Sequence, residues 1–174
     1  MTHDEMLTLI RTRFATLCDP AWEEKDWEIF LGVGPGWYPL VIEYLERVDA
    51  YLNSTDWKGR FFLRQIKEKF GGLRINMRPQ PLPGSGKDEW DTVDDVPLEV
   101  YEEIAIIKDD IYARSDRTCE ECGEPGQRRP ELSLIQTLCD GHFDERMREK
   151  KRLKNRAKAE KRKLKKVASR SLQS

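Results

Sequence analysis

Apolar side chains recur every three or four residues in several stretches of this chain, the spacing that places them on one face of a helix. The first stretch follows Thr2 and Glu5, whose spacing is that of a capping box at a helix start. In a later stretch, Phe62, Ile66 and Phe70 are expected to face inward. The pattern predicts four helices, over residues 4–17, 37–52, 58–70 and 97–114.

One segment alternates between apolar and polar residues instead. Leu73, Ile75 and Met77 are separated by polar residues, which predicts a half-buried strand over residues 73–78. The preceding Gly71-Gly72 pair is expected to end the helix over 58–70, because glycine readily adopts the left-handed conformation found at helix ends. Residues 79–86 are rich in proline, glycine and serine and predict a loop, which the acidic residues 88–95 extend.

The last 35 residues have a different pattern. From Asp140 onward the chain has one glycine and no proline, which permits a single helix of about 30 residues, roughly 45 Å long. Its apolar positions are sparse, so most of the helix is expected to be solvated or frayed unless it has a partner. A weak heptad in it leaves a pairing helix as an alternative.

Charge is distributed unevenly along the chain. Of 31 Lys+Arg and 32 Asp+Glu, residues 145–174 hold 14 basic and 3 acidic residues, a net charge of +11. Residues 1–144 therefore hold 17 basic and 29 acidic residues, a net charge of −12. An acidic body with a strongly basic tail indicates a polyanionic partner for the tail, or an acidic surface that includes the protein's own.

The composition also excludes some classes of protein. With 36% charged and only 38% hydrophobic residues, a large enzyme-like core is not expected. No run approaches the roughly 18–20 apolar residues of a membrane span. The N-terminus lacks the basic, apolar and small-residue regions of a signal sequence. These features predict a soluble cytoplasmic protein.

Four residues have the spacing of a metal site. Cys119-x2-Cys122 and Cys139-x2-His142 are separated by 16 residues, and zinc is held by four such nitrogen and sulfur ligands. We expect one structural zinc in a treble-clef or zinc-ribbon-like finger. The alternatives are unpaired structural cysteines or a redox CxxC pair. The remaining Cys18 is expected to be a buried free thiol, which favours a reducing compartment.

The predicted fold is therefore α+β and mostly helical. We expect an acidic helical and β body over residues 1–114, the zinc finger over 115–144, and the basic C-terminal helix or tail over 145–174.

A catalytic function has little support in the sequence. A closed four-ligand zinc site leaves no coordination position for water or substrate. The only other histidine is His3, so no internal histidine remains as a general base. An acidic loop with Mg²⁺ is an alternative, although a solvated loop is favoured; its carboxylates are Asp88, Asp91, Asp94 and Asp95. We therefore predict a protein that is not an enzyme.

The basic segments predict binding to the phosphate backbone of DNA or RNA. Phosphates would neutralise the tail and release counterions, and the tail has no aromatic residue for base stacking. The predicted contact residues in the tail are Lys150, Lys151, Arg152, Lys154, Arg156, Lys158, Lys161 and Arg162. Arg60, Arg64 and Lys67 are expected to add a second positive surface on one helix face. The alternatives are a solubilising or disordered tail, and a solvated helix face paired with residues 88–95.

Four segments together resemble a known family. They are Gly34-Pro-Gly-Trp37, the stretch QIKEKFGGLR at 65–74, TCEECGEPG at 118–126 and TLCDGH at 137–142. In order and spacing they resemble an uncharacterised family of small bacterial and phage zinc-finger-containing proteins. The resemblance covers about residues 30–142. It implies a bacterial or phage cytoplasmic protein with a zinc finger, and it implies no activity.

A second function is consistent with the same features. The acidic segment over residues 22–37 carries several aromatic residues. In this alternative the chain is a phage-encoded inhibitor or adaptor that binds a host protein through its acidic, aromatic-rich body. No membrane partner and no small-molecule substrate are expected.

Overall fold

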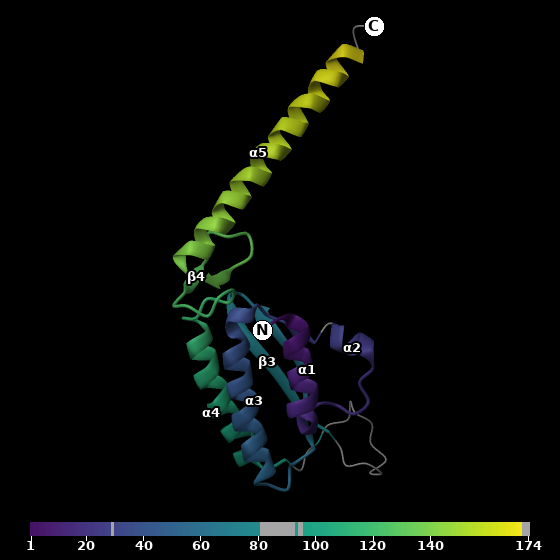
Figure 1. The fold of residues 1–174 in the computed structure, drawn as a ribbon, viewed down its shortest axis with the longest axis vertical. Coiled ribbons are helices and arrows are strands. Elements are labelled where there is room, and N and C mark those ends of the chain that lie inside the picture. The colour runs from purple at the N-terminus through teal and green to yellow at the C-terminus, as the bar shows by residue number, and fades with distance from the viewer. Residues whose placement is uncertain (29, 81–92, 94–95, 172–174) are drawn as a thin grey trace. The chain divides into compact units, whose positions relative to one another are not determined.

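The computed structural model describes residues 1–28, 30–80, 93 and 96–171, and Figure 1 shows their fold. The predicted carboxylates Asp88, Asp91, Asp94 and Asp95 lie outside these residues. The chain divides into two compact units, Met1–Cys139 and Asp140–Ser174, and each is described by itself.

Among its described residues, the first unit has four α-helices and two small sheets. The longer sheet has the strand order β1-β2-β3, and β4 pairs antiparallel with β5 in the other. The helices are α1 (His3–Arg13), α2 (Glu24–Glu28), α3 (Tyr38–Asn53) and α4 (Leu98–Ser115). The strands are β1 (Leu31–Gly32), β2 (Phe61–Lys69), β3 (Gly72–Pro79), β4 (Gln127–Arg129) and β5 (Gln136–Leu138). In Figure 1, α1 and α3 lie in front of β3, and the α+β class is confirmed.

The helices predicted over 37–52 and 97–114 form close to their expected bounds, and the helix predicted over 4–17 starts as expected but ends early, at Arg13. At the start of α1 the Glu5 amide donates to Thr2 Oγ1 at 3.2 Å, and the Thr2 amide donates to Glu5 Oε2 at 2.7 Å. This reciprocal capping box confirms the predicted start. The helix ends at Arg13, and the chain continues as a short 3-10 turn, η1 (Ala15–Leu17). Helices α3 and α4 match the predictions over 37–52 and 97–114 within a residue at each end.

The predicted helix over residues 58–70 is wrong. This segment is β2, which pairs antiparallel with β3 through a two-residue turn at Phe70 and Gly71. Both turn residues have positive φ, 54° and 80°, as a type I′ hairpin turn requires. Gly71-Gly72 thus joins two strands and ends no helix. Phe62 and Ile66 are buried as expected, but Phe70 is 65% exposed.

The outer edge of β3 is covered by α4. The Tyr112 hydroxyl accepts from the Ile75 amide at 2.6 Å and donates to the Ile75 carbonyl at 3.1 Å. The Leu73 amide donates to Ser115 Oγ at 3.3 Å. These bonds satisfy backbone groups that an uncovered edge strand would offer to another chain. The strand predicted over 73–78 is confirmed within β3.

The core lies between the helices and the larger sheet. The apolar stripe of α3, including Val41, Leu45 and Val48, is fully buried. Trp22 packs edge-on against Trp27 and Phe30, with ring centroids 4.9 Å apart in both pairs. Burial of these aromatic rings supplies much of the apolar area that stabilises so small a unit.

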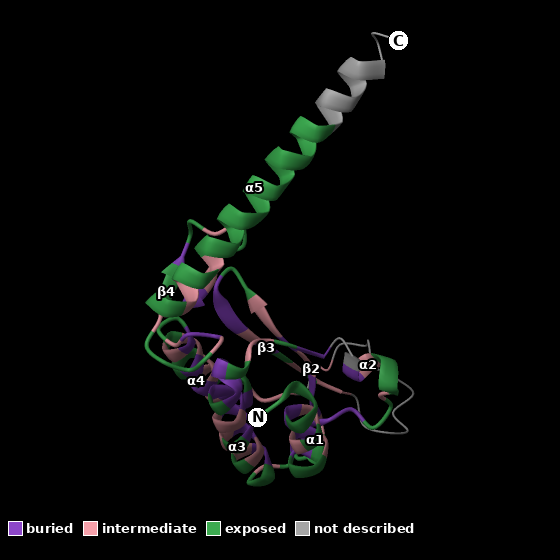
Figure 2. Cartoon of the chain, turned by 45° about the horizontal axis from the view of Figure 1, so that its top comes forward, coloured by how far each residue is buried: buried purple, intermediate pink, exposed green. Residues whose placement is uncertain are grey.

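The second unit is the helix α5 (Asp140–Ser171), which runs unbroken over 32 residues. The predicted single helix of about 30 residues is confirmed. Figure 2 shows that its described side chains are mostly exposed. Within the described residues, no helix is both long enough and apolar enough to cross a membrane.

Candidate metal centre

Three cysteines come together around the C-terminal end of the first unit. Cys119 follows α4 and is buried, Cys122 is exposed, and Cys139 directly follows β5. Their ligand atoms and that of His142 all lie within 4.8 Å of one another. The four residues predicted from their spacing are thus close enough to hold a metal ion.

The sulfur–sulfur distance fits shared ligation of one ion. Cys122 Sγ and Cys139 Sγ are 3.9 Å apart. Two thiolates bound tetrahedrally at about 2.3 Å from one zinc ion lie roughly 3.8 Å apart. A disulfide would need about 2.05 Å between the sulfurs, and all the cysteines are free thiols. The distance is therefore typical of a metal site.

The first cysteine pair lies in a tight turn. The Cys119 carbonyl accepts from the Gly123 amide at 2.9 Å, and the Cys119 amide donates to the Glu124 carbonyl at 2.8 Å. Gly123 has a φ of 81°, which glycine adopts without steric cost. This turn, residues 119–124, is hereafter called the cysteine turn. Gly123 thus lets the backbone fold over the cysteine thiols.

Crowding of the thiols favours a cation between them. The Glu124 amide lowers the pKa of Cys122, but burial and the neighbouring thiols of Cys119 and Cys139 outweigh it and raise that pKa to about 11. Without a cation, the Cys122 thiol therefore resists ionisation. A bound divalent cation reverses this balance because it stabilises thiolates directly.

A motif more than 80 residues earlier packs on the cysteine turn. The Gly36 amide donates to the Glu120 carbonyl at 2.7 Å, and Trp37 Nε1 donates to the Thr118 carbonyl at 2.7 Å. A Cβ atom on Gly36 would lie 2.2 Å from the Cys119 carbonyl oxygen. Only glycine fits this close approach. The sequence pattern gave no physical reason for these contacts; the GPGW segment stood out by resemblance alone.

The β2–β3 turn packs on the β4–β5 hairpin. Thr137 Oγ1 donates to the Gly71 carbonyl at 2.6 Å, and the Arg128 guanidinium donates to the Phe70 carbonyl. The Glu120 amide donates to the Thr137 carbonyl at 3.0 Å, which links the hairpin to the cysteine turn. Residues 117–138 are therefore anchored to the helical body at two separate places.

The donor set of this site suits a structural metal. Among the described residues, the group around Cys119 is the one cluster of three or more His, Cys, Asp and Glu side chains with metal-ligand geometry. Four protein ligands close a tetrahedral ion to water. The arrangement is consistent with a structural metal.

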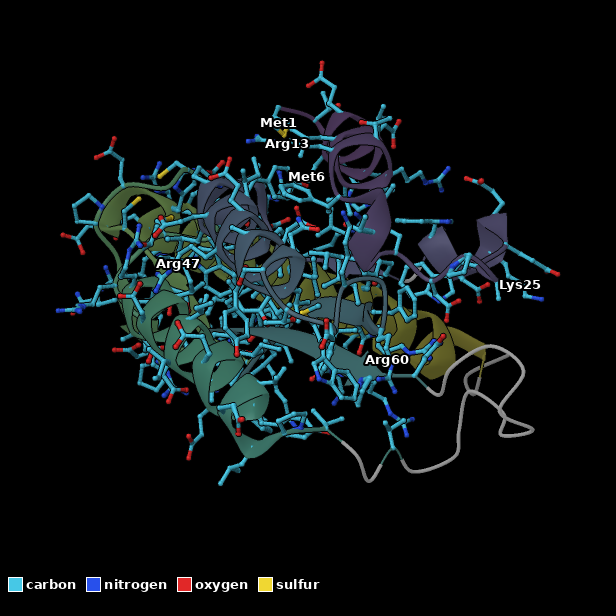
Figure 3. All side chains as sticks on the ribbon, turned by 90° about the horizontal axis from the view of Figure 1, so that it is seen from below. Met1, Met6, Arg13, Lys25, Arg47 and Arg60 are labelled. Carbon is cyan, nitrogen blue, oxygen red and sulfur yellow. The ribbon has the colours of Figure 1, made fainter. Side chains whose placement is uncertain are left out.

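The three basic residues predicted on one helix face lie on or next to a strand instead. Arg60, labelled in Figure 3, precedes β2 and stacks its guanidinium 3.8 Å from the Trp57 ring centroid. Arg64 NH1 lies 2.8 Å from Asp19 Oδ2, with both side chains largely buried. Lys67 is paired in register with Arg74 of β3. The predicted shared helix face is therefore wrong, because the segment is a strand with a bulge at Arg64.

The basic residues predicted on the tail lie on α5. From Met147 to Lys163 every side chain is exposed (Figure 2). The cations of this stretch, with Arg146, are hereafter called the α5 cations. They are Arg146, Arg148, Lys150, Lys151, Arg152, Lys154, Arg156, Lys158, Lys161, Arg162 and Lys163.

The aromatic residues of segment 22–37 are not at the surface. Trp27 is 8% exposed, Phe30 is 1% exposed and Trp37 is fully buried. Trp22 is partly buried, and its ring packs against those of Trp27 and Phe30. An aromatic contact surface for a host protein is therefore not formed by these three rings.

Comparison of the chain with protein-family models, with curated proteins and with solved structures finds no match. The resemblance to the bacterial and phage family stays a prediction.

Proposed function

We propose that this protein is a non-enzymatic nucleic-acid-binding protein that contacts the phosphate backbone through α5. One observation carries the proposal: eleven exposed or half-exposed cations on an unbroken helix with two glutamates among them, Glu149 and Glu160. The competing class, a protein-interaction module, has less support, because three of the rings expected to serve it, those of Trp27, Phe30 and Trp37, are buried.

The distribution of charge on α5 suits a polyanion. At 100° per residue, the α5 cations occupy the whole circumference of the helix. Arg152 and Arg156 lie 4.0 and 3.4 Å from Glu149 and Glu160, respectively, and two carboxylates cannot neutralise eleven cations. Phosphates neutralise such a surface and release condensed counterions into solution.

The residue types on α5 also indicate how it binds. Phe143 is the last aromatic residue in the sequence, so α5 beyond it offers no ring to stack on a base. Lysine and arginine contacts to phosphate position a protein without reading sequence. Binding by α5 is therefore backbone-directed, for DNA or RNA.

The metal in this proposal is one structural zinc ion. Three thiolates and one imidazole form a donor set that suits zinc and is closed once all four ligands bind. Cys119, Cys122, Cys139 and His142 hold it. The ion then stabilises the cysteine turn and the start of α5, since His142 is the third residue of that helix.

The test compares two full-length variants that differ in charge. Lys150, Lys151, Lys154 and Lys158 are replaced together by Gln in one variant and by Arg in the other. Fluorescence anisotropy of a labelled 20-base-pair duplex is followed over a salt series. We expect a log–log salt slope of several units for the wild type and for the Arg variant. The Gln variant should lose about three to four units of slope, at ~0.9 per neutralised phosphate.

Two results would contradict the proposal. Equal slopes for the Gln and Arg variants would show that α5 does not contact phosphates. If the wild type binds neither duplex DNA nor RNA at low salt, the proposed function is wrong and a protein partner of the acidic body becomes the next candidate.

A further inference from the structure

The turn between β2 and β3 contains a residue that is poorly suited to it. Phe70 has a φ of 54° and is 65% exposed. Turns of this type favour Asn or Gly at such positions, and a bulky residue there is an outlier. Because the ring is largely exposed, its burial does not offset the strain. The sequence therefore tolerates an aromatic ring at this turn at a cost to stability.

Several cations lie at this turn. Lys67 and Lys69 share one face of β2, and Lys69 Nζ lies 5.6 Å from the Phe70 ring centroid. Arg74 is paired directly with Lys67 across the strands, an arrangement of like charges that destabilises a sheet. The Arg128 guanidinium donates to the Phe70 carbonyl. Four cations thus gather at one turn.

The acidic groups near the turn leave it positive. Glu68 Oε1 accepts from the Gly71 amide at 2.5 Å and so serves the turn itself. Asp116 lies beside Gly72 and the Arg74 guanidinium, which also stacks 5.0 Å from the Tyr112 ring centroid. Within the described part of the chain, neither carboxylate forms an ion pair with Lys67 or Lys69. An anion bound near these two lysines would relieve the repulsion between Lys67 and Arg74.

We propose that this turn is a stacking site for single-stranded nucleic acid. An unpaired base stacks on the Phe70 ring, and the phosphates on either side of it contact Lys67, Lys69 and Arg128. An exposed ring among cations is the arrangement by which proteins hold single strands without reading their sequence. In a duplex the faces of the bases are occupied by their neighbours, so the ring engages single strands only. The inference rests on the proposed function: α5 binds any phosphate backbone, and the turn adds a preference for unpaired bases.

The test uses the full chain with one substitution at the turn. Phe70→Asn removes the ring and supplies a residue that the turn favours. Leu134→Asn is the matched control, because Leu134 is 76% exposed and is also an apolar residue on the first unit. Anisotropy is measured with a 12-nucleotide oligo(dT) and with a 12-base-pair duplex at one salt concentration.

We expect Phe70→Asn to weaken oligo(dT) binding by roughly tenfold, the effect of losing one stacked base, and to leave duplex binding unchanged. Its melting temperature should equal or exceed that of the wild type, since the strain at φ 54° is relieved. Leu134→Asn should change neither affinity. Phe70→Trp should keep the oligo(dT) affinity because it keeps a ring.

Other results overturn the inference. Unchanged oligo(dT) binding by Phe70→Asn, or equal weakening for oligo(dT) and duplex, contradicts stacking on Phe70 while leaving α5 as the phosphate contact. A lower melting temperature for Phe70→Asn, with no rescue of oligo(dT) binding by Phe70→Trp, shows a structural role for the ring. Failure of the wild type to bind either probe contradicts the proposed function itself.

Discussion

The two units of this chain obtain their structure in different ways. In Met1–Cys139, side chains such as Leu45, Leu63 and Ile111 are fully buried, and the helices are held by the core they share. In α5, Leu153 is 54% exposed and every side chain from Met147 to Lys163 is in contact with solvent. A helix without a buried face is marginal in water unless something else stabilises it. We therefore expect α5 to depend on a partner for its stability.

The two units also differ in how their charged side chains are arranged. In the first unit, arginines meet specific carboxylates: Arg64 lies 2.8 Å from the buried Asp19, and Arg114 donates two hydrogen bonds to Glu43. In α5 the cations far outnumber the acids. Charge in the first unit thus positions parts of the chain against one another, whereas we expect the excess positive charge on α5 to meet phosphate.

The largest expected effect is the loss of a metal ligand. Cys119→Ser or Cys139→Ser should abolish stoichiometric zinc and remove hydrogen-exchange protection from residues 117–138. Structural zinc contributes about 10 kcal/mol or more to the folding of small finger peptides. Metal analysis of the wild type should give about one zinc ion per chain. Cys18→Ala, a change at a buried cysteine outside the site, is the control and should keep the metal. Full occupancy in either serine variant would show that the ligand assignment is wrong.

Replacing one leucine in each unit by alanine tests the contrast in burial. Leu45→Ala removes a fully buried side chain and should lower the free energy of unfolding by about 3 kcal/mol. Leu153→Ala, on exposed α5, should change it by less than about 0.5 kcal/mol. Urea unfolding followed by tryptophan fluorescence checks both values. Similar losses in the two variants would mean that α5 has a buried face after all.

The packing of Gly36 on the cysteine turn gives a smaller effect. Gly36→Ala forces a Cβ atom toward the Cys119 carbonyl oxygen and should cost about 2 kcal/mol of stability and weaken zinc retention against a chelator. Gly32→Ala is the control, because its Cβ atom would lie 3.8 Å from the nearest atom, an ordinary contact. Thermal unfolding of both variants, with and without chelator, measures the difference. Equal stability of the two would contradict the close approach.

The smallest expected effect is a pH dependence from Cys18. Burial raises the pKa of this thiol from 9.0 to about 11, although Arg11 lowers it slightly. The folded state therefore holds the proton more tightly than the unfolded state, so stability falls as pH rises from about 9 to 11. At pH 10 the loss is about 1 kcal/mol. Between pH 8 and pH 10, the free energy of unfolding should fall by about 1 kcal/mol less in Cys18→Ala than in the wild type. Urea unfolding at the two pH values measures this difference.

Local patterns predicted most helices but missed β2. The positions of α3 and α4 followed from apolar periodicity. In β2, the bulge between Leu63 and Gln65 shifts the alternation, so that Phe61 and Leu63 fall out of phase with Ile66. Phe62, Ile66 and Phe70 then match a helical period by coincidence. The signal in the sequence was the Gly71-Gly72 pair directly before the alternating segment, since glycine adopts the positive φ that a hairpin turn requires.

The metal ligands were predictable because their spacing is local. Cys119 and Cys122 close one turn, and Cys139 and His142 are three residues apart. The contacts of Gly36 and Trp37 with that turn join segments more than 80 residues apart, which no periodicity encodes. The same limit applies to the cations around Phe70, since Arg128 reaches that turn from another hairpin.

The central claim is that the first unit is folded by its own core while α5 is the surface that meets nucleic acid. Hydrogen exchange of the full chain, with and without a saturating 20-base-pair duplex at low salt, tests this most directly. Without duplex, amides of residues 146–163 should exchange rapidly, and duplex should slow them while leaving those of α3 and α4 unchanged. Slowed exchange confined to residues 1–139, or no change anywhere on adding duplex, would contradict the account.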